Sequence, residues 1–120
     1  MNLTVYGIPN CDTVKKARAW LDARQRPYQF HDFKKAGVPE ARLPQWIART
    51  GWEKLVNRQG TTWRKLPPEL QAQIQDAASA TQLMLDQASI IKRPVVEWPD
   101  GSVTVGFNET AWTEKLAAGV

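Results

Sequence analysis

Apolar and polar residues follow two different periods along the chain, and the change of period predicts where strands and helices lie. Leu3-Thr4-Val5-Tyr6 is rich in β-forming residues and is followed by a glycine and a proline, which indicates a buried strand over 3–7. After Cys11 the spacing becomes helical, because four apolar residues recur on one helical face: Val14, Ala17, Trp20 and Leu21. This helix is expected to end near Gln25, since Pro27 disfavours a helical residue before it.

A second strand is predicted over 28–33, where Tyr28-Gln29-Phe30-His31-Asp32-Phe33 alternates polar and aromatic residues. The order strand, helix, strand within one short stretch is a βαβ unit. We therefore expect the two strands to be parallel and the connection between them to be right-handed.

The middle of the chain, about 36–90, shows helical spacing and helix breakers but no convincing strand. Leu43, Trp46 and Ile47 predict a short amphipathic helix that ends at Gly51. Residues 52–58 continue the helical pattern, and the polar stretch 59–62 is expected to be a loop.

Two more helices are expected in this middle segment. Pro67-Pro68-Glu69 opens the first of them, because proline is tolerated in the first turn of a helix. Leu70, Ile74 and either Ala77 or Ala78 are expected to form its apolar face. Leu83-Met84-Leu85 belong to the second.

Strand character returns at 94–98 and 103–106, on either side of Pro99-Asp100-Gly101-Ser102. This turn predicts a β-hairpin, because proline presets φ, aspartate bonds its own backbone, and glycine accepts a positive φ. Asn108 is expected to cap a last helix over 109–116, with Trp112 and Leu116 facing the core.

The order of elements is therefore β-α-β, a helical insertion, then β-β-α, which predicts an α/β fold with a four-stranded mixed sheet. A length of 120 residues is typical of one domain, and 42% hydrophobic with 23% charged residues argues against disorder. We expect a single domain over 1–120, with a core of about 1–35 and 91–120 and the helical insertion at about 36–90.

Composition and charge exclude several classes of protein. No apolar run approaches the roughly 18 residues of a membrane span, and the N-terminus shows no signal peptide. The net charge of +4 is too modest to imply direct nucleic-acid binding, and the six tryptophans are too dispersed for a stacking platform. We expect these tryptophans mainly in the core. One cysteine and one histidine argue against a metal site, and a free thiol without an export signal favours the cytoplasm.

Cys11 is the residue whose position most suggests chemistry. It follows a strand and a tight turn and stands where a helix begins, and unpaired N–H groups there stabilise a thiolate. Lys15 adds to this positive field and Asp12 opposes it. The alternative is that Cys11 is simply a small buried apolar residue. Position 14 is valine, so the chain has no Cys-x-x-Cys pair, and an oxidised Cys11 needs an outside thiol to resolve it.

Three arginines and the histidine are further candidates. Arg93-Pro94 opens the third strand, and X-Pro bonds carry most cis peptides, so we expect a cis bond beside Cys11 whose backbone pairs with an extended thiol peptide. The alternative is a trans proline with Arg93 solvated. Arg58 and Arg64 flank the polar loop and either reaches a site or only aids solubility. His31 is expected on a face of the sheet rather than as a base.

At this point the chain resembles a known family, the ArsC/Spx family, and within it the YffB branch. The resemblance spans nearly the whole chain, and its segments recur in the same order. They are Tyr6-Gly7-Ile8-Pro9-Asn10-Cys11-Asp12-Thr13-Val14-Lys15-Lys16-Ala17, Gly51-Trp52-Glu53, Asn57-Arg58-Gln59-Gly60-Thr61-Thr62-Trp63-Arg64-Lys65-Leu66, Ile91-Lys92-Arg93-Pro94-Val95 and Val105-Gly106-Phe107-Asn108-Glu109. The resemblance implies a thioredoxin-like fold with a helical insertion.

The family includes glutaredoxin-coupled arsenate reductases, and this resemblance implies roles for particular residues. Cys11 falls on the nucleophile that attacks arsenate and is resolved by glutathione. Arg93 falls on the arginine before the cis-proline, while the upstream arginine falls on Asn57 or on Arg58 one place later. The third arginine of the family falls at about Phe107 and is absent here. The residues expected to contact substrate are Asn10, Arg58, Arg93 and Pro94.

Two functions follow as expectations. The first is a glutathione-dependent thiol reductase related to arsenate reductase, with glutathione as co-substrate, glutaredoxin as partner, and no tightly bound cofactor or metal. The alternative is a regulatory protein similar to Spx, whose relatives bind RNA polymerase and sense oxidants through a Cys-x-x-Cys switch. Val14 interrupts that switch in this chain. Neither function involves a membrane or direct contact with nucleic acid.

Overall fold

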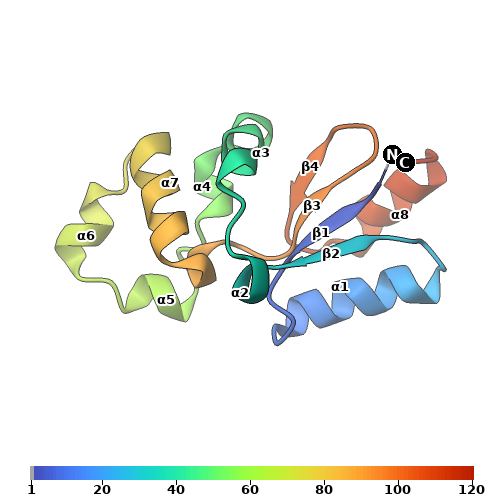
Figure 1. The fold of residues 1–120 in the computed structure, drawn as a ribbon, viewed down its shortest axis with the longest axis horizontal. Helices are drawn as coiled ribbons and strands as arrows, with labels where there is room; N and C mark the ends of the chain where they lie inside the picture. Colours follow the sequence, from blue (N-terminus) through green and yellow to red (C-terminus); the bar gives the residue numbers. More distant parts are fainter. Residues whose placement is uncertain (1) are drawn as a thin grey trace. The chain divides into compact units, whose positions relative to one another are not determined.

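Four short strands form a mixed sheet in the order β2-β1-β3-β4 in the computed structural model, which describes residues 2–120 (Figure 1). The strands are β1 (Thr4–Gly7), β2 (Gln29–Asp32), β3 (Val95–Glu97) and β4 (Val103–Val105). β1 is parallel to β2 and antiparallel to β3, and β3 is antiparallel to β4. The predicted α/β class, the parallel βαβ pair and the four strand positions are confirmed, each to within two residues at either end.

Helix α1 (Asp12–Ala23) connects the two parallel strands, and α8 (Glu109–Ala117) closes the chain. The four apolar residues predicted to line one face of α1 are all buried: Val14, Ala17, Trp20 and Leu21. Asn108 caps α8 as predicted, because its Oδ1 accepts the backbone N–H of Ala111 at 2.9 Å. Trp112 is buried on α8, and Leu116 packs partly buried against the same core.

One core cluster lies on a face of the sheet, against α1 and α8. Val5 and Val96 are partners across β1 and β3 and both have no exposed surface, and Val95 on the opposite face of β3 is also fully buried. Tryptophans from α1, from the end of β3 and from α8 then fill the space between the sheet and the helices: Trp20, Trp98 and Trp112.

The β3–β4 turn forms the predicted hairpin. Gly101 has a φ of 89°, a value that glycine adopts without strain, and its N–H donates to the carbonyl of Trp98 at 2.9 Å. Asp100 Oδ1 accepts the backbone N–H of Ser102 at 2.9 Å, which closes the turn from the other side.

Contacts within the chain divide it into two compact units, one of residues up to Phe33 together with Arg93–Val120, and one of Lys34–Lys92. The second unit is helical. Its elements begin with α2 at the junction and are α2 (Phe33–Ala36), η1 (Glu40–Arg42), α3 (Leu43–Thr50), α4 (Trp52–Leu55), α5 (Thr61–Arg64), α6 (Pro68–Gln73), α7 (Ala77–Asp86) and η2 (Ala88–Ile90). An isolated bridge between Val56 and Ile91 links the residue after α4 to the end of this unit.

Two details of the second unit differ from the sequence prediction. The helix that opens at Pro68 ends at Gln73, so Ala77 and Ala78 belong to the next helix and lie exposed rather than on an apolar face. The reason is a capping box at Asp76, whose carboxylate accepts the N–H of Ser79 at 2.8 Å and starts a new helix there. The stretch predicted as a loop over 59–62 also forms the first turn of α5 from Thr61.

A close contact between β1 and α1 gives a prediction about stability. A Cβ atom at Gly7 would lie 2.9 Å from Cγ2 of Val14, which has no exposed surface and a stiff, β-branched side chain. We expect Gly7→Ala to lower the free energy of unfolding by about 1–3 kcal/mol through overpacking. Urea denaturation would measure this, and adding Val14→Ala should relieve the clash so that the two effects are not additive. An unchanged urea midpoint in Gly7→Ala would contradict the overlap.

Candidate functional site

The thiol of Cys11 stands at the entrance of α1. Cys11 is the N-cap residue, with an extended backbone at φ −126° and ψ 126°, and its carbonyl accepts the first helical hydrogen bond from Lys15 at 2.9 Å. The residue is half-buried. This placement follows from the local sequence, because Gly7 at the end of β1 and Pro9 after it turn the chain directly into a helix of twelve residues.

The groups around this thiol favour its ionised form. Burial raises the pKa of Cys11, but the N–H of Val14, the hydrogen bond and charge of Arg93, and the N–H of Thr13 together outweigh it. The pKa therefore lies below the ordinary value for cysteine, in the direction that the sequence predicts. A thiolate is the reactive form of cysteine, so this environment suits a nucleophile.

Arg93 and Pro94 belong to the same unit as the thiol, and the Arg93 side chain hydrogen-bonds Cys11. The peptide bond between them is cis, as predicted. Arg93 is half-buried and Pro94 is buried, and the Pro94 carbonyl accepts the N–H of Gly106 at 2.9 Å. Of the predicted substrate contacts, Arg93 is the one that the structure brings into hydrogen-bonding contact with Cys11.

Asn10 is exposed on the turn that precedes the thiol. Its Oδ1 accepts a hydrogen bond from Lys15 Nζ at 3.4 Å, so the lysine expected to add to the positive field is held near the start of α1. Asn10 and Lys15 thus border the entrance of the helix, where an incoming anionic group would meet them.

The two candidate arginines of the second unit differ in their surroundings. The guanidinium carbon of Arg58 lies 5.2 Å from the ring centre of Trp52 and 5.8 Å from that of Trp63. Arg64 is exposed and shows no ring contact. The expectation that the six tryptophans lie mainly in the core is confirmed by the four buried ones, while Trp52 and Trp63 are half-buried. Trp52 stands six residues before Arg58 and Trp63 five residues after it, and this spacing was the only sign in the sequence that they lie near that arginine.

Phe107 occupies the place where the resemblance would put a third arginine. Its ring centre lies 4.7 Å from that of Trp112 and 6.1 Å from that of Trp20, both in edge-to-face geometry. Phe107 is thus part of the packing around α8. The resemblance places the family's third arginine at about this position, and Phe107 supplies no guanidinium there.

The remaining candidate residue from the sequence is His31. His31 lies on β2, with its ring centre 5.1 Å from that of Tyr6, its partner across the strands. Within residues 2–120, no group of three or more His, Cys, Asp or Glu side chains is arranged to hold a metal ion. No helix of the described residues is long and apolar enough to cross a membrane.

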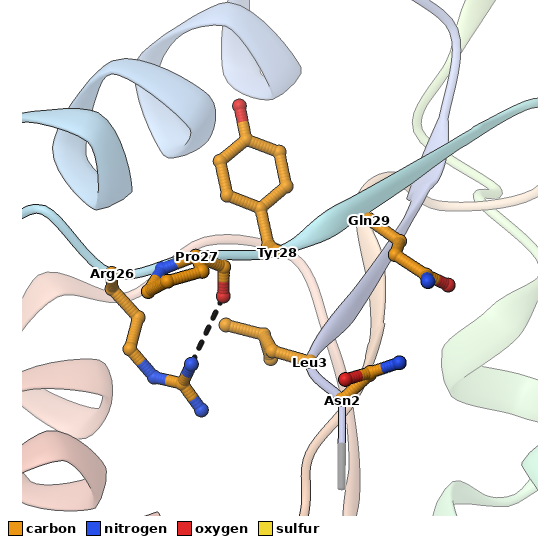
Figure 2. Close-up of a pocket in the computed structure, with 6 residues that line it drawn as sticks. All are labelled: Asn2, Leu3, Arg26, Pro27, Tyr28 and Gln29. Carbon is orange, nitrogen blue, oxygen red and sulfur yellow. Dashed lines mark hydrogen bonds between the residues drawn. The ribbon is translucent and has the colours of Figure 1, made fainter.

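A surface pocket of about 150 Å³ lies at the opening of β2, and Figure 2 shows the six residues that line it. Leu3 forms its apolar floor, while the Arg26 guanidinium turns back to donate to the Pro27 carbonyl at 3.0 Å. None of the predicted site residues lines this pocket. The chemistry of the thiol, and not the shape of this hollow, therefore identifies the candidate site.

Removing the Arg93 charge should weaken the thiolate. We expect Arg93→Gln to move the pKa of Cys11 upward, because the variant loses the positive charge beside the sulfur, whereas Arg93→Lys should keep part of the effect. The rate of alkylation by iodoacetamide as a function of pH reports this pKa. In the wild-type protein the midpoint should fall below the free-thiol value of about 8.5. A wild-type midpoint at or above that value would support an inert, buried cysteine.

Comparison with known proteins places these features in context. A model of the ArsC family matches residues 6–115. Among solved structures, the YffB protein is 46% identical with a TM-score of 0.89, covering 94% of this chain and 97% of its own. An arsenate reductase (ArsC) related protein from Brucella melitensis is 47% identical with a TM-score of 0.75, covering 97% of this chain and 95% of its own.

The chain is also similar to curated sequences, among them a transcriptional regulator. An uncharacterized protein from Haemophilus influenzae is 37% identical over 115 residues, covering 96% of this chain and 99% of its own length. More distant is the global transcriptional regulator Spx from Enterococcus faecalis, 26% identical and covering 89% of this chain and 80% of its own.

Proposed function

We propose that this chain, which belongs to the ArsC family, is a glutathione-dependent thiol reductase related to arsenate reductase. One observation carries the proposal: the lone Cys11 thiol stands at the start of α1 beside Arg93, with its pKa lowered. Helix N–H groups and a guanidinium around one sulfur are what a nucleophilic thiolate requires.

The proposed reaction uses two exchanges at that sulfur. The Cys11 thiolate attacks the glutathione sulfur of a mixed disulfide, the old S–S bond breaks, and the released thiolate takes a proton from solvent. Cys11 is then joined to glutathione. A second glutathione thiolate attacks this adduct, which releases glutathione disulfide and restores the Cys11 thiolate. The substrate thiol is reduced, and one glutathione is oxidised as it joins the glutathione taken from the mixed disulfide, so electrons balance. Glutaredoxin is the proposed partner that accepts the adduct.

An outside thiol is needed because the chain has a single cysteine. Val14, at the position of a Cys-x-x-Cys partner, has no exposed surface and packs against β1. No second thiol exists in the chain to resolve an adduct. Glutathione is therefore proposed as the co-substrate, and Arg93, Asn10 and Pro94 of the first unit are the proposed contacts of glutathione and of the substrate. Arg58, which belongs to the second unit, stays a prediction from the sequence.

Arsenate is proposed to be a poorer substrate than a mixed disulfide. An arsenate dianion is best held by several bidentate guanidinium groups, and Phe107 stands where the family's third arginine is expected. A disulfide is neutral at its reacting sulfur and needs no such receptor. The thiolate and the nearby positive charge suffice for thiol exchange.

A regulatory function like that of Spx is the second candidate. The observation that favours it is the similarity to Spx over 89% of this chain. In this alternative the protein binds RNA polymerase, and Val14 rules out an intramolecular disulfide as its switch.

Coupled assays test the proposal. Purified protein would be given glutathione with either a glutathione mixed disulfide or arsenate, with and without glutaredoxin, and formation of glutathione disulfide would be followed. We expect turnover with the mixed disulfide, at a higher kcat/KM than with arsenate. Absence of turnover on both substrates, together with recovery of RNA polymerase on the immobilised protein, would overturn the reductase in favour of the regulator.

A further inference from the structure

We propose that the outer edge of β2 is a docking edge for an extended, acidic segment of a partner protein, and that Arg18 binds a carboxylate of that segment. This edge and Arg18 both belong to the first unit. Gln29 at the start of β2 pairs with Thr4 at the start of β1, whereas Cys11 follows the other end of β1. The docking edge is therefore a feature separate from the proposed chemistry of the thiol.

β2 is an outermost strand of the sheet, so its backbone has one side open to a further strand. In the part of the chain that the structure describes, β1 is the strand that pairs with it. The Gln29 N–H donates to the Leu3 carbonyl at 2.8 Å, so the peptide groups of Gln29 face β1. Successive residues of a strand direct their peptide groups to alternate sides, so the N–H and carbonyl of Phe30 face away from β1. An extended segment can bond to them, which is recognition by strand addition.

The Arg18 side chain on α1 lies against the aromatic residues of this docking edge. Its guanidinium carbon is 4.0 Å from the ring centre of Phe30 and 5.9 Å from that of Tyr28. Its Nε donates to the Tyr28 hydroxyl at 3.1 Å. Cation–π attraction and one hydrogen bond thus fix the guanidinium, and neither contact uses its terminal nitrogens. Because the side chain is already held in place, binding a ligand costs it little entropy.

No carboxylate of residues 2–120 forms an ion pair with Arg18, although Asp22 stands one helical turn further along α1. Both residues border a surface hollow of about 430 Å³, whose other lining residues are Arg26, Pro27, Tyr28 and Phe30. The Arg26 guanidinium is turned to the Pro27 carbonyl, to which it donates at 3.0 Å (Figure 2). We therefore assign the anion contact in this hollow to Arg18, whose terminal donors are available.

A glutamate on the added strand has the geometry to reach this guanidinium. In antiparallel pairing, the residue opposite Phe30 places its side chain on the same face of the sheet, with the two Cβ atoms about 4.5–5.5 Å apart. Arg18 lies over Phe30 on that face, and a carboxylate there accepts parallel N–H donors from the guanidinium. A second copy of this chain, paired through its own Phe30, would instead bring another Arg18 to the same place. Charge therefore favours an acidic partner over self-association.

Titration of the isotope-labelled full chain with blocked synthetic peptides, followed by NMR, tests the docking edge. The probe is a heptapeptide in which valine and glutamate alternate, so that its glutamates share one face of a strand. At physiological salt we expect saturable shifts of the Phe30 backbone amide and of the Arg18 Nε–H signal. The same peptide with lysine in place of glutamate should not bind. N-methylation of the glutamate nitrogens should abolish binding, because it removes backbone donors that pair with β2.

Variants locate the carboxylate contact. Arg18→Gln should lower the affinity for the glutamate peptide about tenfold, and Asp22→Asn, which removes negative charge from the hollow, should raise it about twofold. Arg24→Gln is the matched control, because Arg24 also lies against an aromatic ring, 3.8 Å from that of Trp20, but does not line the hollow. Its affinity should stay within about twofold of the wild type. If Arg18→Gln fails to fold, Tyr28→Phe, which removes the hydroxyl that holds Nε, should lower the affinity about threefold.

Several results would overturn the docking edge. They are the absence of a saturable shift with the glutamate peptide, equal binding of the lysine peptide, and an equal loss of affinity in Arg24→Gln. Self-association of Arg18→Gln, with no peptide bound by the wild type, would show that Arg18 only shields the strand from other chains. Shifts caused by a single-stranded oligonucleotide and not by the peptide would assign the surface to nucleic acid. The pH profile of Cys11 alkylation should be unchanged in all these variants, which separates this test from that of the reductase.

Discussion

Replacing Cys11 with serine is expected to lower glutathione-dependent turnover by roughly a thousandfold or more, to the rate of the uncatalysed exchange. A serine hydroxyl does not ionise near neutral pH, so the N–H groups of Val14 and Thr13 and the charge of Arg93 would have no anion to stabilise. No other cysteine of the chain can take over the attack. Initial rates of the glutathione-coupled assay with a mixed disulfide would measure the loss.

The fold of Cys11→Ser should remain intact, because the exchanged side chain is half-buried and serine is a favourable N-cap residue. Circular dichroism and the urea midpoint would verify this. Turnover within tenfold of the wild type would exclude Cys11 as the nucleophile. Binding of RNA polymerase, if the regulatory alternative holds, should survive the same substitution, so one variant separates the two functions.

The framework of the first unit could be predicted because its signals are local. Leu3-Thr4-Val5-Tyr6 has few conformations open to it, and the change of period after Cys11 marks a helix whose four apolar residues are all buried. The hairpin at Asp100 and Gly101 is equally local, since each turn residue acts on its own backbone. Such elements need no knowledge of distant contacts.

Element boundaries in the second unit were harder to predict, because competing caps decide them. The helical spacing from Leu70 through Ala77 suggests one helix, but Asp76 and Ser79 form a reciprocal cap that starts a new helix between them. A Ser at the third position of a helix is a weaker signal than the Glu or Gln usually found there. The pattern therefore extended the first helix past its end at Gln73 to Ala77 or Ala78, which belong to the next helix.

The candidate site likewise contains residues that local sequence signals identify and residues that only the folded structure identifies. Cys11 could be found from its place between a strand and a helix, whereas its contact with Arg93 joins residues at opposite ends of the sequence. Trp52 and Trp63 were harder still, since a tryptophan in sequence gives no sign of whether it packs in a core or faces a cation. Their surroundings depend on the fold of the helical unit as a whole.

The largest loss of stability is expected at one of the six tryptophans, Trp112. Trp112 is 1% exposed, and its ring centre lies 4.7 Å from Phe107, 5.3 Å from Trp98 and 5.8 Å from Trp20, each in edge-to-face geometry. We expect Trp112→Ala to lower the free energy of unfolding by about 3–5 kcal/mol, since it leaves a cavity between α8, α1 and the sheet. Urea denaturation followed by far-ultraviolet circular dichroism would measure the change.

The matched control is Trp63→Ala, which removes the same side chain from a half-buried position. Because part of that ring is already in contact with water and its neighbours can close over the gap, the loss there should be less than half as large. Each variant should lower the urea midpoint without a change in slope. Equal losses at the two positions would contradict the division between core and cation-facing tryptophans, and a loss below about 1 kcal/mol in Trp112→Ala would show that α8 contributes little to the core.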